Sequence, residues 1–512
     1  MYIIPNTTVK LFKNCPLDKS YENTILFASA SAQTTFFASL TGYTFSAQTY
    51  QRVNKGKIRV AMNAEPLYNC NYMAFQNASF GSKWFYAFVL AVEYVNNTTS
   101  EITYQIDVLQ TWHFDYVLRQ CLVEREHSTT DNVGDNLLPE NLELGEYITD
   151  DFDGTNNLAP KVIVVAATFD DQYQPISGTI YSGIFSGLYY HVYPNTTPGA
   201  VACAAFIANA GASSSGIVSV FLMPESMVTN MLDPAKSYTI SKTKKISGTI
   251  DGYTPRNKKL YTYPFNFLYV TNMQGNAGVF PYEYFSSSTC DFLLAGDMSP
   301  NPSVVMAPIN YKGVSNDFPN YDEKMVLSGY PQLGFNVDTY RAWLAQNAST
   351  LALNALSSGM TLAGGIAAEN PVVAAQGITG ALGVVNQVYQ HSIMPHQAKG
   401  GAGSTTNCAI GLQDFMFMHK HIRGEFAHII DDYFDMFGYA CHRVKIPNRN
   451  ARPEWSYVKT IGCKIDPATA SGLPGDDMEI IESLYNNGIR WWNNPAHIGN
   501  YTYSNAPVTP GG

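Results

Sequence analysis

Residues 83–109 read KWFYAFVLAVEYVNNTTSEITYQIDVL, and this stretch indicates the fold class. An apolar run from Lys83 to Leu90 leads into a polar cluster at 96–100, where turn-forming residues gather. Beyond the cluster, apolar and polar side chains alternate with the period of two that is typical of a strand. The apolar set is Ile102, Tyr104, Ile106 and Val108. Two strands around a polar turn predict a β-hairpin.

The composition extends this β assignment to the whole chain of 512 residues. Aromatic residues make up 13% and include 34 Tyr, whereas charged residues make up 14%, against about 25% in a typical soluble protein. Because aromatic residues are enriched in strands, we expect a mainly β protein whose surface is polar rather than ionic. At about 100–200 residues per domain, the length predicts two to four domains.

The charge balance excludes two classes of protein. The chain has 31 Lys and Arg against 41 Asp and Glu, which gives a formal net charge of −10. Disordered chains combine low hydrophobicity with high net charge, and proteins that bind nucleic acid through its phosphates are basic. A mainly disordered chain and an electrostatic reader of nucleic acid are therefore both excluded.

The cysteines and short motifs give no sign of catalysis. No two of the eight cysteines stand two or three residues apart, which excludes a zinc ribbon and a CxxC redox motif. The GxxxxGK[ST], HExxH and GxSxG motifs are absent as well. Since the first residues lack a basic region and a continuous apolar run, we expect no secretory signal, and free thiols in a reducing cytoplasm.

Two local patterns predict further elements. Residues 162–167 are continuously apolar, which is typical of a strand that is buried on both faces. Residues 476–487 predict a short helix, because Asp476 and Asp477 suit its positive N-terminal end and Gly488 can take the left-handed closing position.

Three polar clusters are candidates for ligand binding. The acidic run 150–154 lacks the spacing and the terminal Glu of a calcium loop. The densest set of potential zinc ligands is His419, His421, His428, Cys441 and His442. His419 and His421 would share one strand face, but Lys420, Arg423 and Arg443 lie among these residues and favour a basic strand face instead. A third cluster fits either a polyanion-binding patch or, preferably, a solvated loop face; it comprises Lys242, Lys244, Lys245, Arg256, Lys258 and Lys259.

The most unusual segment is almost free of charge. From 342 to 398 the only formally charged side chain is Glu369. The core of the segment, 351–385, has two apolar arms, 351–368 and 371–385, which would span about 27 Å and about 22 Å as helices. Pro371 separates them, because proline cannot continue the hydrogen-bond ladder of a helix. The segment is therefore either a helical hairpin with a polar tip or two flexible apolar arms.

Two interpretations of this segment are open. Each arm alone is too rich in Ala and Gly for a permanent membrane anchor, so a buried Ala/Gly-rich helical pair in a soluble core is one interpretation. The other is conditional membrane insertion by several copies, since small residues allow close helix–helix contact. The candidate membrane-active residues are Leu351, Leu353, Leu356, Met360, Leu362, Ile366, Glu369, Pro371, Val372, Val373, Ile378, Leu382, Val384 and Val385.

Several blocks of sequence resemble a known family. The chain resembles the distal tube, or tail-knob, proteins of short-tailed, phi29-like bacteriophages over about 1–130 and 335–512. The blocks that carry the resemblance are YENT (21–24), YMAFQNA (72–78), KWFYAFV (83–89), IDVLQTW (106–112), REH (125–127), RVKIPN (443–448), NGI (487–489) and IGNY (498–501).

The resemblance implies a function and a set of partners. It implies a homohexamer that forms a tube of β-barrel domains at the distal end of the virion tail, through which viral DNA passes without sequence recognition. Apolar loops would plug the tube and then form a pore in the host cytoplasmic membrane during genome ejection. The expected neighbours are an upstream tail or collar protein and a tail-tip protein that degrades the cell wall. The resemblance implies no enzymatic activity. We expect no cofactor and no bound metal ion.

These considerations predict four regions in a mainly β chain. We expect an N-terminal β tube domain over 1–130 and a β-rich middle or distal domain over 131–335. We then expect the membrane-active loop over 336–415 and a C-terminal β segment over 416–512 that completes the tube. Two alternative functions stay open at this point, namely a receptor-binding tail protein that uses 130–335 and a tail-associated cell-wall hydrolase.

Overall fold

The structure is a computed structural model of the whole chain. It describes residues 6–48, 56–78, 81, 83–155, 158–170, 180–181, 184–185, 188–209, 217–228, 237–297, 302–314, 317–334, 413–469 and 471–507. The predicted mainly β fold is confirmed, because most of the described elements are strands in sheets.

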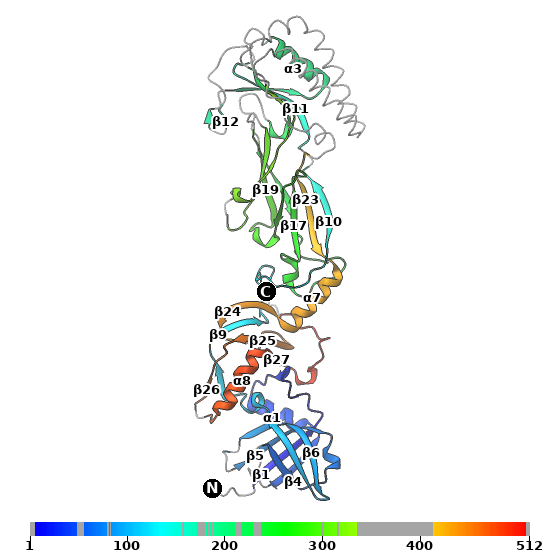
Figure 1. Cartoon of the computed structure of the whole chain (residues 1–512), viewed down its shortest axis with the longest axis vertical. Coiled ribbons are helices and arrows are strands. Elements are labelled where there is room, and N and C mark those ends of the chain that lie inside the picture. The colour runs from blue at the N-terminus through cyan, green and yellow to red at the C-terminus, as the bar shows by residue number, and fades with distance from the viewer. Residues whose placement is uncertain are drawn as a thin grey trace. The chain divides into compact units, whose positions relative to one another are not determined.

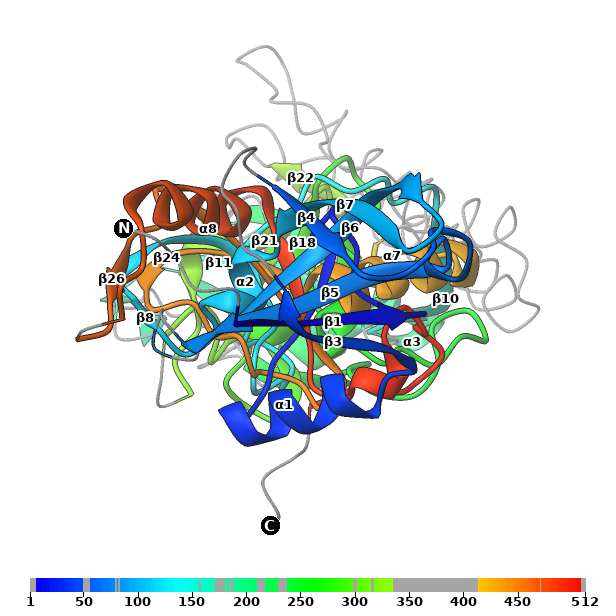
Figure 2. The ribbon, with the colours of Figure 1, turned by 90° about the horizontal axis from the view of Figure 1, so that it is seen from below.

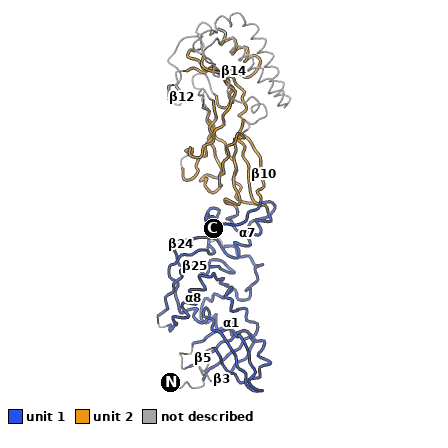
Figure 3. Tube along the Cα trace, viewed as in Figure 1, with its two compact units in different colours: residues 1–145, 249–260, 424–512 blue, residues 146–248, 261–423 orange. Residues whose placement is uncertain are grey.

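The chain divides into two compact units, shown in blue and orange in Figure 3. Unit 1 comprises residues 1–145, 249–260 and 424–512, and unit 2 comprises 146–248 and 261–423. We predicted divisions after 130, 335 and 415 along the chain. The units differ from them in grouping 131–145 and 249–260 with the terminal regions, and most of the predicted 336–415 region lies outside the described residues.

Unit 1 begins with a six-stranded antiparallel sheet (Figure 1). Its edge strands approach each other, so the sheet curls into a partial barrel. The predicted hairpin is confirmed as the neighbouring strands β6 and β7. In spatial order the strands are β3 (Gly42–Gln48), β1 (Thr7–Lys13), β5 (Cys70–Asn77), β6 (Trp84–Asn96), β7 (Thr99–Ile106) and β4 (Lys57–Val60).

Two hydrophobic clusters lie on opposite faces of this sheet. On β5, Met73 and Phe75 join the cluster on one face, and Tyr72 and Ala74 join the cluster on the other. Successive side chains of a strand point to opposite faces, so one strand contributes to both clusters. Helix α1 (Ala30–Ser39) lies along the sheet (Figure 2), and its Phe37 ring stacks on the ring of Tyr72, with ring centroids 5.4 Å apart.

The predicted hairpin extends too far at its C-terminal end. Val108 was expected in the second strand, but the structure places it in the helical turn α2 (Val108–Thr111). The side chain of Asp107 accepts a hydrogen bond from the backbone N–H of Gln110 at 3.1 Å. Asp107 therefore caps the N-terminus of α2, and the strand ends before it. The alternating pattern of the sequence conceals this helix signal.

The second sheet of unit 1 joins the two ends of the chain. Near the N-terminus, β2 pairs in parallel with the C-terminal strand β27. Its five strands in spatial order are β2 (Asn23–Ile25), β27 (Ile489–Trp492), β25 (Trp455–Ile461), β9 (Cys121–Glu126) and β24 (Tyr439–Lys445), and a separate pair comprises β8 (Tyr116–Leu118) and β26 (Ile465–Pro467).

The predicted C-terminal helix is confirmed as α8 (Gly475–Asn487). Gly488 closes it at φ +93°, and its N–H donates to the carbonyls of Leu484 (3.1 Å) and Tyr485 (3.3 Å). A Cβ atom at Gly488 would lie 2.1 Å from the Tyr457 hydroxyl. Both the backbone angle and the close packing therefore require glycine at this position.

One carboxylate fixes the 249–260 segment within unit 1. Asp431, fully buried in helix α7 (Gly424–Phe437), accepts hydrogen bonds from the backbone N–H groups of Arg256 (2.7 Å) and Asn257 (3.0 Å) and from the Tyr253 hydroxyl (2.8 Å). A buried carboxylate is costly unless such donors surround it, so its contacts specify where this segment lies.

Unit 2 is built from three four-stranded sheets that share one hydrophobic core. The predicted doubly buried strand is confirmed as β11. The first sheet comprises β10 (Tyr147–Gly154), β23 (Met416–Ile422), β17 (Asn266–Thr271) and β18 (Ala277–Phe280); the second, β14 (Tyr189–Pro194), β11 (Pro160–Ala167), β15 (Ile217–Pro224) and β22 (Gln332–Gly334); the third, β16 (Ser237–Thr243), β19 (Thr289–Asp297), β20 (Ser303–Ile309) and β21 (Met325–Leu327). The remaining elements of unit 2 include β12 (Ile180–Tyr181), β13 (Ile184–Phe185) and α3 (Thr197–Asn209).

Candidate functional site

All fourteen candidate membrane-active residues, from Leu351 to Val385, lie outside the described residues. The prediction of a helical hairpin or of apolar arms there stays a prediction. Within the described ranges, no helix combines the length and the apolar character that are needed to span a membrane.

The structure does describe where this segment departs and returns. It leaves after β22, in the second sheet of unit 2, and re-enters at Gln413, just before β23. The side-chain amide of Gln413 donates to the Gly329 carbonyl at 3.2 Å, and Phe415 is fully buried. The chain before the segment, at Gly329, and the chain after it, at Gln413, are therefore hydrogen-bonded to each other beside the hydrophobic core of unit 2.

The predicted zinc-ligand set is only partly brought together. His419 and His421 lie on the buried face of β23, where they are 8% and 1% exposed, with ring centroids 5.3 Å apart. His428, Cys441 and His442 belong to unit 1. The favoured interpretation as a basic strand face is wrong for these two histidines, because both lie on the buried face of β23. Lys420, which stands between them in the sequence, lies on the opposite face, over the Tyr269 ring.

A third potential ligand, a carboxylate, lies beside these two histidines. The carboxylate oxygen Oδ2 of Asp150, in β10, lies 2.7 Å from Nε2 of His421. In the pairing of β10 with β23, the register shifts between Thr149 and Asp151, which makes Asp150 the extra residue of a β-bulge. The three groups lie within 4.8 Å of one another, and burial lowers the pKa of His419 to about 4.

The acidic run does not form a calcium loop. Asp151 is paired with Lys245 at 3.0 Å, and Asp153 is paired with Lys242. The three carboxylates of the run therefore have three different partners along one strand. The hydrogen bond from Lys245 lowers the pKa of Asp151, which agrees with an ordinary ion pair.

The basic cluster is dispersed as well. Lys242, Lys244 and Lys245 belong to unit 2, whereas the other three members belong to unit 1. There, Arg256 is paired with Asp432 and with Asp435. Lys259 is buried against Glu140. The favoured interpretation as a solvated loop face is wrong for Lys259, which is buried in an ion pair, whereas Arg256 and Lys245 do lie at exposed positions.

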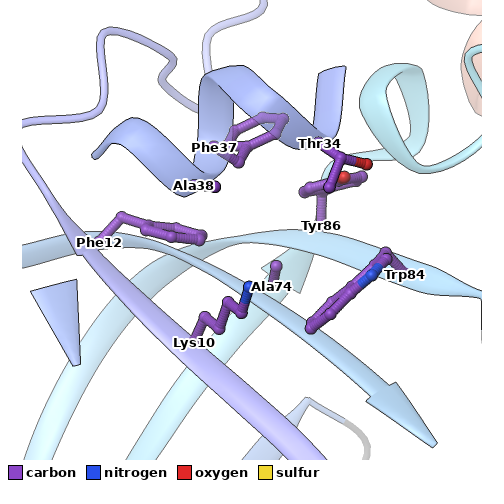
Figure 4. Close-up of a pocket in the computed structure, with 8 residues that line it drawn as sticks. All are labelled: Lys10, Phe12, Thr34, Phe37, Ala38, Ala74, Trp84 and Tyr86. Carbon is purple, nitrogen blue, oxygen red and sulfur yellow. The ribbon is translucent and has the colours of Figure 1, made fainter. Parts of the chain in front are cut away.

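Figure 4 shows a small cleft between α1 and the first sheet. It has about 10 Å³ of space for a water-sized molecule, far less than the ~300–1,000 Å³ that is usual for a ligand site. The Nζ atom of Lys10 lies 4.8 Å from the centroid of the Trp84 ring, so this side chain covers one side of the cleft. The lining residues are Lys10, Phe12, Thr34, Phe37, Ala38, Ala74, Trp84 and Tyr86. This small aromatic cleft is a packing feature of unit 1.

Sequence comparisons match both parts of the chain to tail proteins. A family model described as the C-terminal domain of the Bacillus phage phi29 tail knob protein gp9 matches residues 231–506. A second model, described as the N-terminus of caudoviral major tail proteins, matches residues 5–117. The tail knob proteins gp9 of Bacillus phage PZA and Bacillus phage phi29 are 25% and 23% identical to this chain, each over 98% of this chain and 99% of the relative.

A structural comparison agrees with these matches. The tail knob protein gp12 of bacteriophage C1 is similar with a TM-score of 0.62 and 15% identity, over 98% of this chain and 99% of that protein. At this identity the similarity establishes the fold.

The matches to these relatives extend through the middle region, which the sequence blocks quoted above did not cover. Both relatives are named as tail knob proteins, which are structural, so the cell-wall hydrolase alternative is set aside. The chain therefore belongs to the tail knob protein gp9 family of phi29-like phages, as a structural component of the virion tail and not an enzyme.

Proposed function

We propose that this chain forms a homohexameric tube at the distal end of the tail that conducts viral DNA during genome ejection. In this proposal the 351–385 segments first plug the tube, then leave it and form a pore in the host cytoplasmic membrane. The upstream contact is a tail or collar protein, and the tip carries a separate protein that degrades the cell wall.

The single observation that carries the proposal is a charge-poor insertion within a structural tail protein. From 342 to 398 the chain has one formally charged residue, although charged residues make up 14% of the whole chain. Its flanks are fixed side by side in unit 2 through Gln413 and Gly329. In this proposal the described β core on both sides stays in place while the segment leaves the tube.

The net charge is compatible with a conduit. Six chains at −10 each carry about −60 formally, so the assembly as a whole repels DNA phosphates rather than retaining them. Broad subunit interfaces with few charged groups are also in keeping with the low ionic content of the chain.

Dye leakage from liposomes tests the membrane function. The full chain is compared with a variant in which residues 351–385 are replaced by a polar Gly/Ser linker of equal length. We expect the full chain to release the dye and the linker variant to release none, while both keep the same ring shape in electron micrographs. Equal leakage from both proteins would contradict the assignment of the pore to 351–385.

A further inference from the structure

We propose that Asp150, His419 and His421 form a binding site for a divalent transition-metal ion, with Zn²⁺ as the best fit. The site lies within unit 2 and cross-links β10 to β23, the first strand after the 335–412 segment. This inference does not depend on pore formation or on the hexamer.

The hydrogen bonds of His421 carry the argument. Its Nδ1 lies 2.7 Å from the Ile422 carbonyl oxygen, which can only accept, so Nδ1 carries the proton and donates it there. Its Nε2 lies 2.7 Å from Oδ2 of Asp150, which as a carboxylate also accepts. A neutral imidazole has one N–H and satisfies one of these two contacts. The second contact needs a further cation between nitrogen and carboxylate, either a proton or a metal ion.

The second histidine is held in a similar way. Nδ1 of His419 lies 2.8 Å from the hydroxyl of Tyr282, in the short helix Tyr282–Tyr284. This contact occupies Nδ1 and leaves Nε2 of His419 for a metal. Metal-binding histidines commonly hold one ring nitrogen on a backbone carbonyl or another polar group and coordinate through the other. The surroundings of both rings follow that arrangement.

The geometry requires a small adjustment. Bonds of about 2.0–2.2 Å at tetrahedral angles place the ligand atoms of Zn²⁺ about 3.3 Å apart. The His421–Asp150 pair, now at 2.7 Å, has to separate, and the other ligand atoms, which lie within 4.8 Å of one another, have to approach. The Asp150 side chain is 52% exposed and can rotate, whereas both rings are packed.

The ligand types select the metal. Two imidazoles and one carboxylate suit Zn²⁺ and related transition metals, whereas Ca²⁺ and Mg²⁺ prefer oxygen ligands alone. Because Asp150 faces solvent, an ion can enter from that side and keep water as a fourth ligand. Asp151 is not needed, since Lys245 already holds its carboxylate.

Metal titration of the full, metal-free chain tests the site. We expect one Zn²⁺ to bind per chain, to raise the melting temperature and to resist displacement by excess Mg²⁺ or Ca²⁺. Asp150→Asn should weaken Zn²⁺ binding by about tenfold or more, and His421→Gln should do the same. Co²⁺, used as a coloured substitute, should show the visible absorption of a four-coordinate site in the unsubstituted protein only.

Two control variants locate the site. Asp153→Asn changes a similarly exposed carboxylate on the same strand, and His428→Gln removes the exposed histidine that pairs with Asp432. Both should bind Zn²⁺ as the unsubstituted chain does. The proposal is overturned if Asp150→Asn keeps full affinity for Zn²⁺, if His428→Gln loses that affinity, or if the unsubstituted chain does not bind Zn²⁺ at micromolar concentration.

Discussion

His127 shows how single buried residues fix the structure of unit 1. Its Nδ1 accepts a hydrogen bond from the backbone N–H of Tyr457 at 2.8 Å, so Nε2 carries the proton and faces the carbonyls of Phe434 (3.2 Å) and Asp435 (3.1 Å). A neutral ring thus joins β25 to the end of α7. Burial, with a smaller contribution from the charge of Arg452, lowers the pKa of His127 to about 3.

This shift predicts a loss of stability in acid. The unfolded chain binds a proton on this histidine below about pH 6.5, whereas the folded chain binds it only near pH 3. The contribution is therefore constant above about pH 6.5 and declines by up to ~1.4 kcal/mol per pH unit between the two values. We expect His127→Gln to lower the melting temperature at pH 7 but to flatten its decline between pH 6.5 and pH 4.

The matched control is His428→Gln. His428 is exposed on α7, and its loss should lower the melting temperature at pH 7 by less than the loss of the buried His127. Parallel profiles for His127→Gln and the unsubstituted protein would contradict the role assigned to His127.

The charge of Glu369 gives a prediction about the pH dependence of the proposed membrane insertion. An ionised carboxylate at bilayer depth costs roughly 2.5–3.5 kcal/mol on insertion scales, and protonation removes much of that cost. We expect acidic pH to increase liposome leakage by the full chain, and Glu369→Gln to weaken this pH dependence. Glu143→Gln, at an exposed position of unit 1, should keep it. The same leakage at every pH for all three proteins would refute the idea.

The candidate metal site was only partly predictable from the sequence. His419 and His421 could be paired because they stand two apart in a strand-like stretch, but no local pattern connects Asp150 with them. Asp150 lies 271 positions from His421 and meets it only through a bulge in a long-range strand pair. The sequence also grouped His428, Cys441 and His442 with the two histidines, because closeness along the chain does not reveal that the chain passes into another unit at 424.

Elements with local signals were predictable. The helix expected at 476–487 is Gly475–Asn487, and the hairpin turn expected at 96–100 lies between strands that end at Asn96 and restart at Thr99. Periodicity and end signals operate within one or two turns of chain, so they can be read without the tertiary fold. The α2 turn was missed because its four residues show no helical period.

The end of α8 gives a test at this scale. Gly488→Ala introduces a side chain at φ +93° and against the Tyr457 hydroxyl. We expect it to destabilise the protein by more than about 1–2 kcal/mol and to lower the melting temperature in thermal denaturation.

Gly472→Ala is the matched control for this substitution. Gly472 has φ +67° with no atom near its would-be Cβ, so the substitution brings backbone strain without a clash. It should therefore cost less than Gly488→Ala. An equal loss of melting temperature in the two variants would show that contact with Tyr457 contributes nothing.

For the whole molecule, the least predictable feature is the pairing of distant segments. β2 pairs with β27, which is more than 460 positions away: Asn23 lies opposite Arg490. The 249–260 segment is drawn into unit 1 by Asp431. No periodicity records such contacts, so the sequence predicted the β class but not how the chain passes between the two units.

The proposed hexamer gives a test at the same scale. β24 is an edge strand of the second sheet, and its Val444 side chain is 70% exposed. Exposed aliphatic groups on an unpaired edge favour contact with another chain. We expect Val444→Glu to abolish six-fold rings in electron micrographs and to yield smaller species in light scattering. Ile429→Glu, at an exposed position of α7, should keep the rings, and rings in both variants would remove β24 from the interface.

The hydrogen bond between Gln413 and Gly329 holds the two ends of the intervening chain together and so limits how far that chain can reach. From residue 335 to Glu369 there are 35 residues, the shorter of the two paths to the polar tip. That path measures about 50 Å as a continuous helix and about 120 Å when fully extended. Either length exceeds the ~30 Å hydrocarbon thickness of a bilayer. In the proposed mechanism, this length of chain is enough for the tip to reach the far leaflet while the two described units stay outside the bilayer.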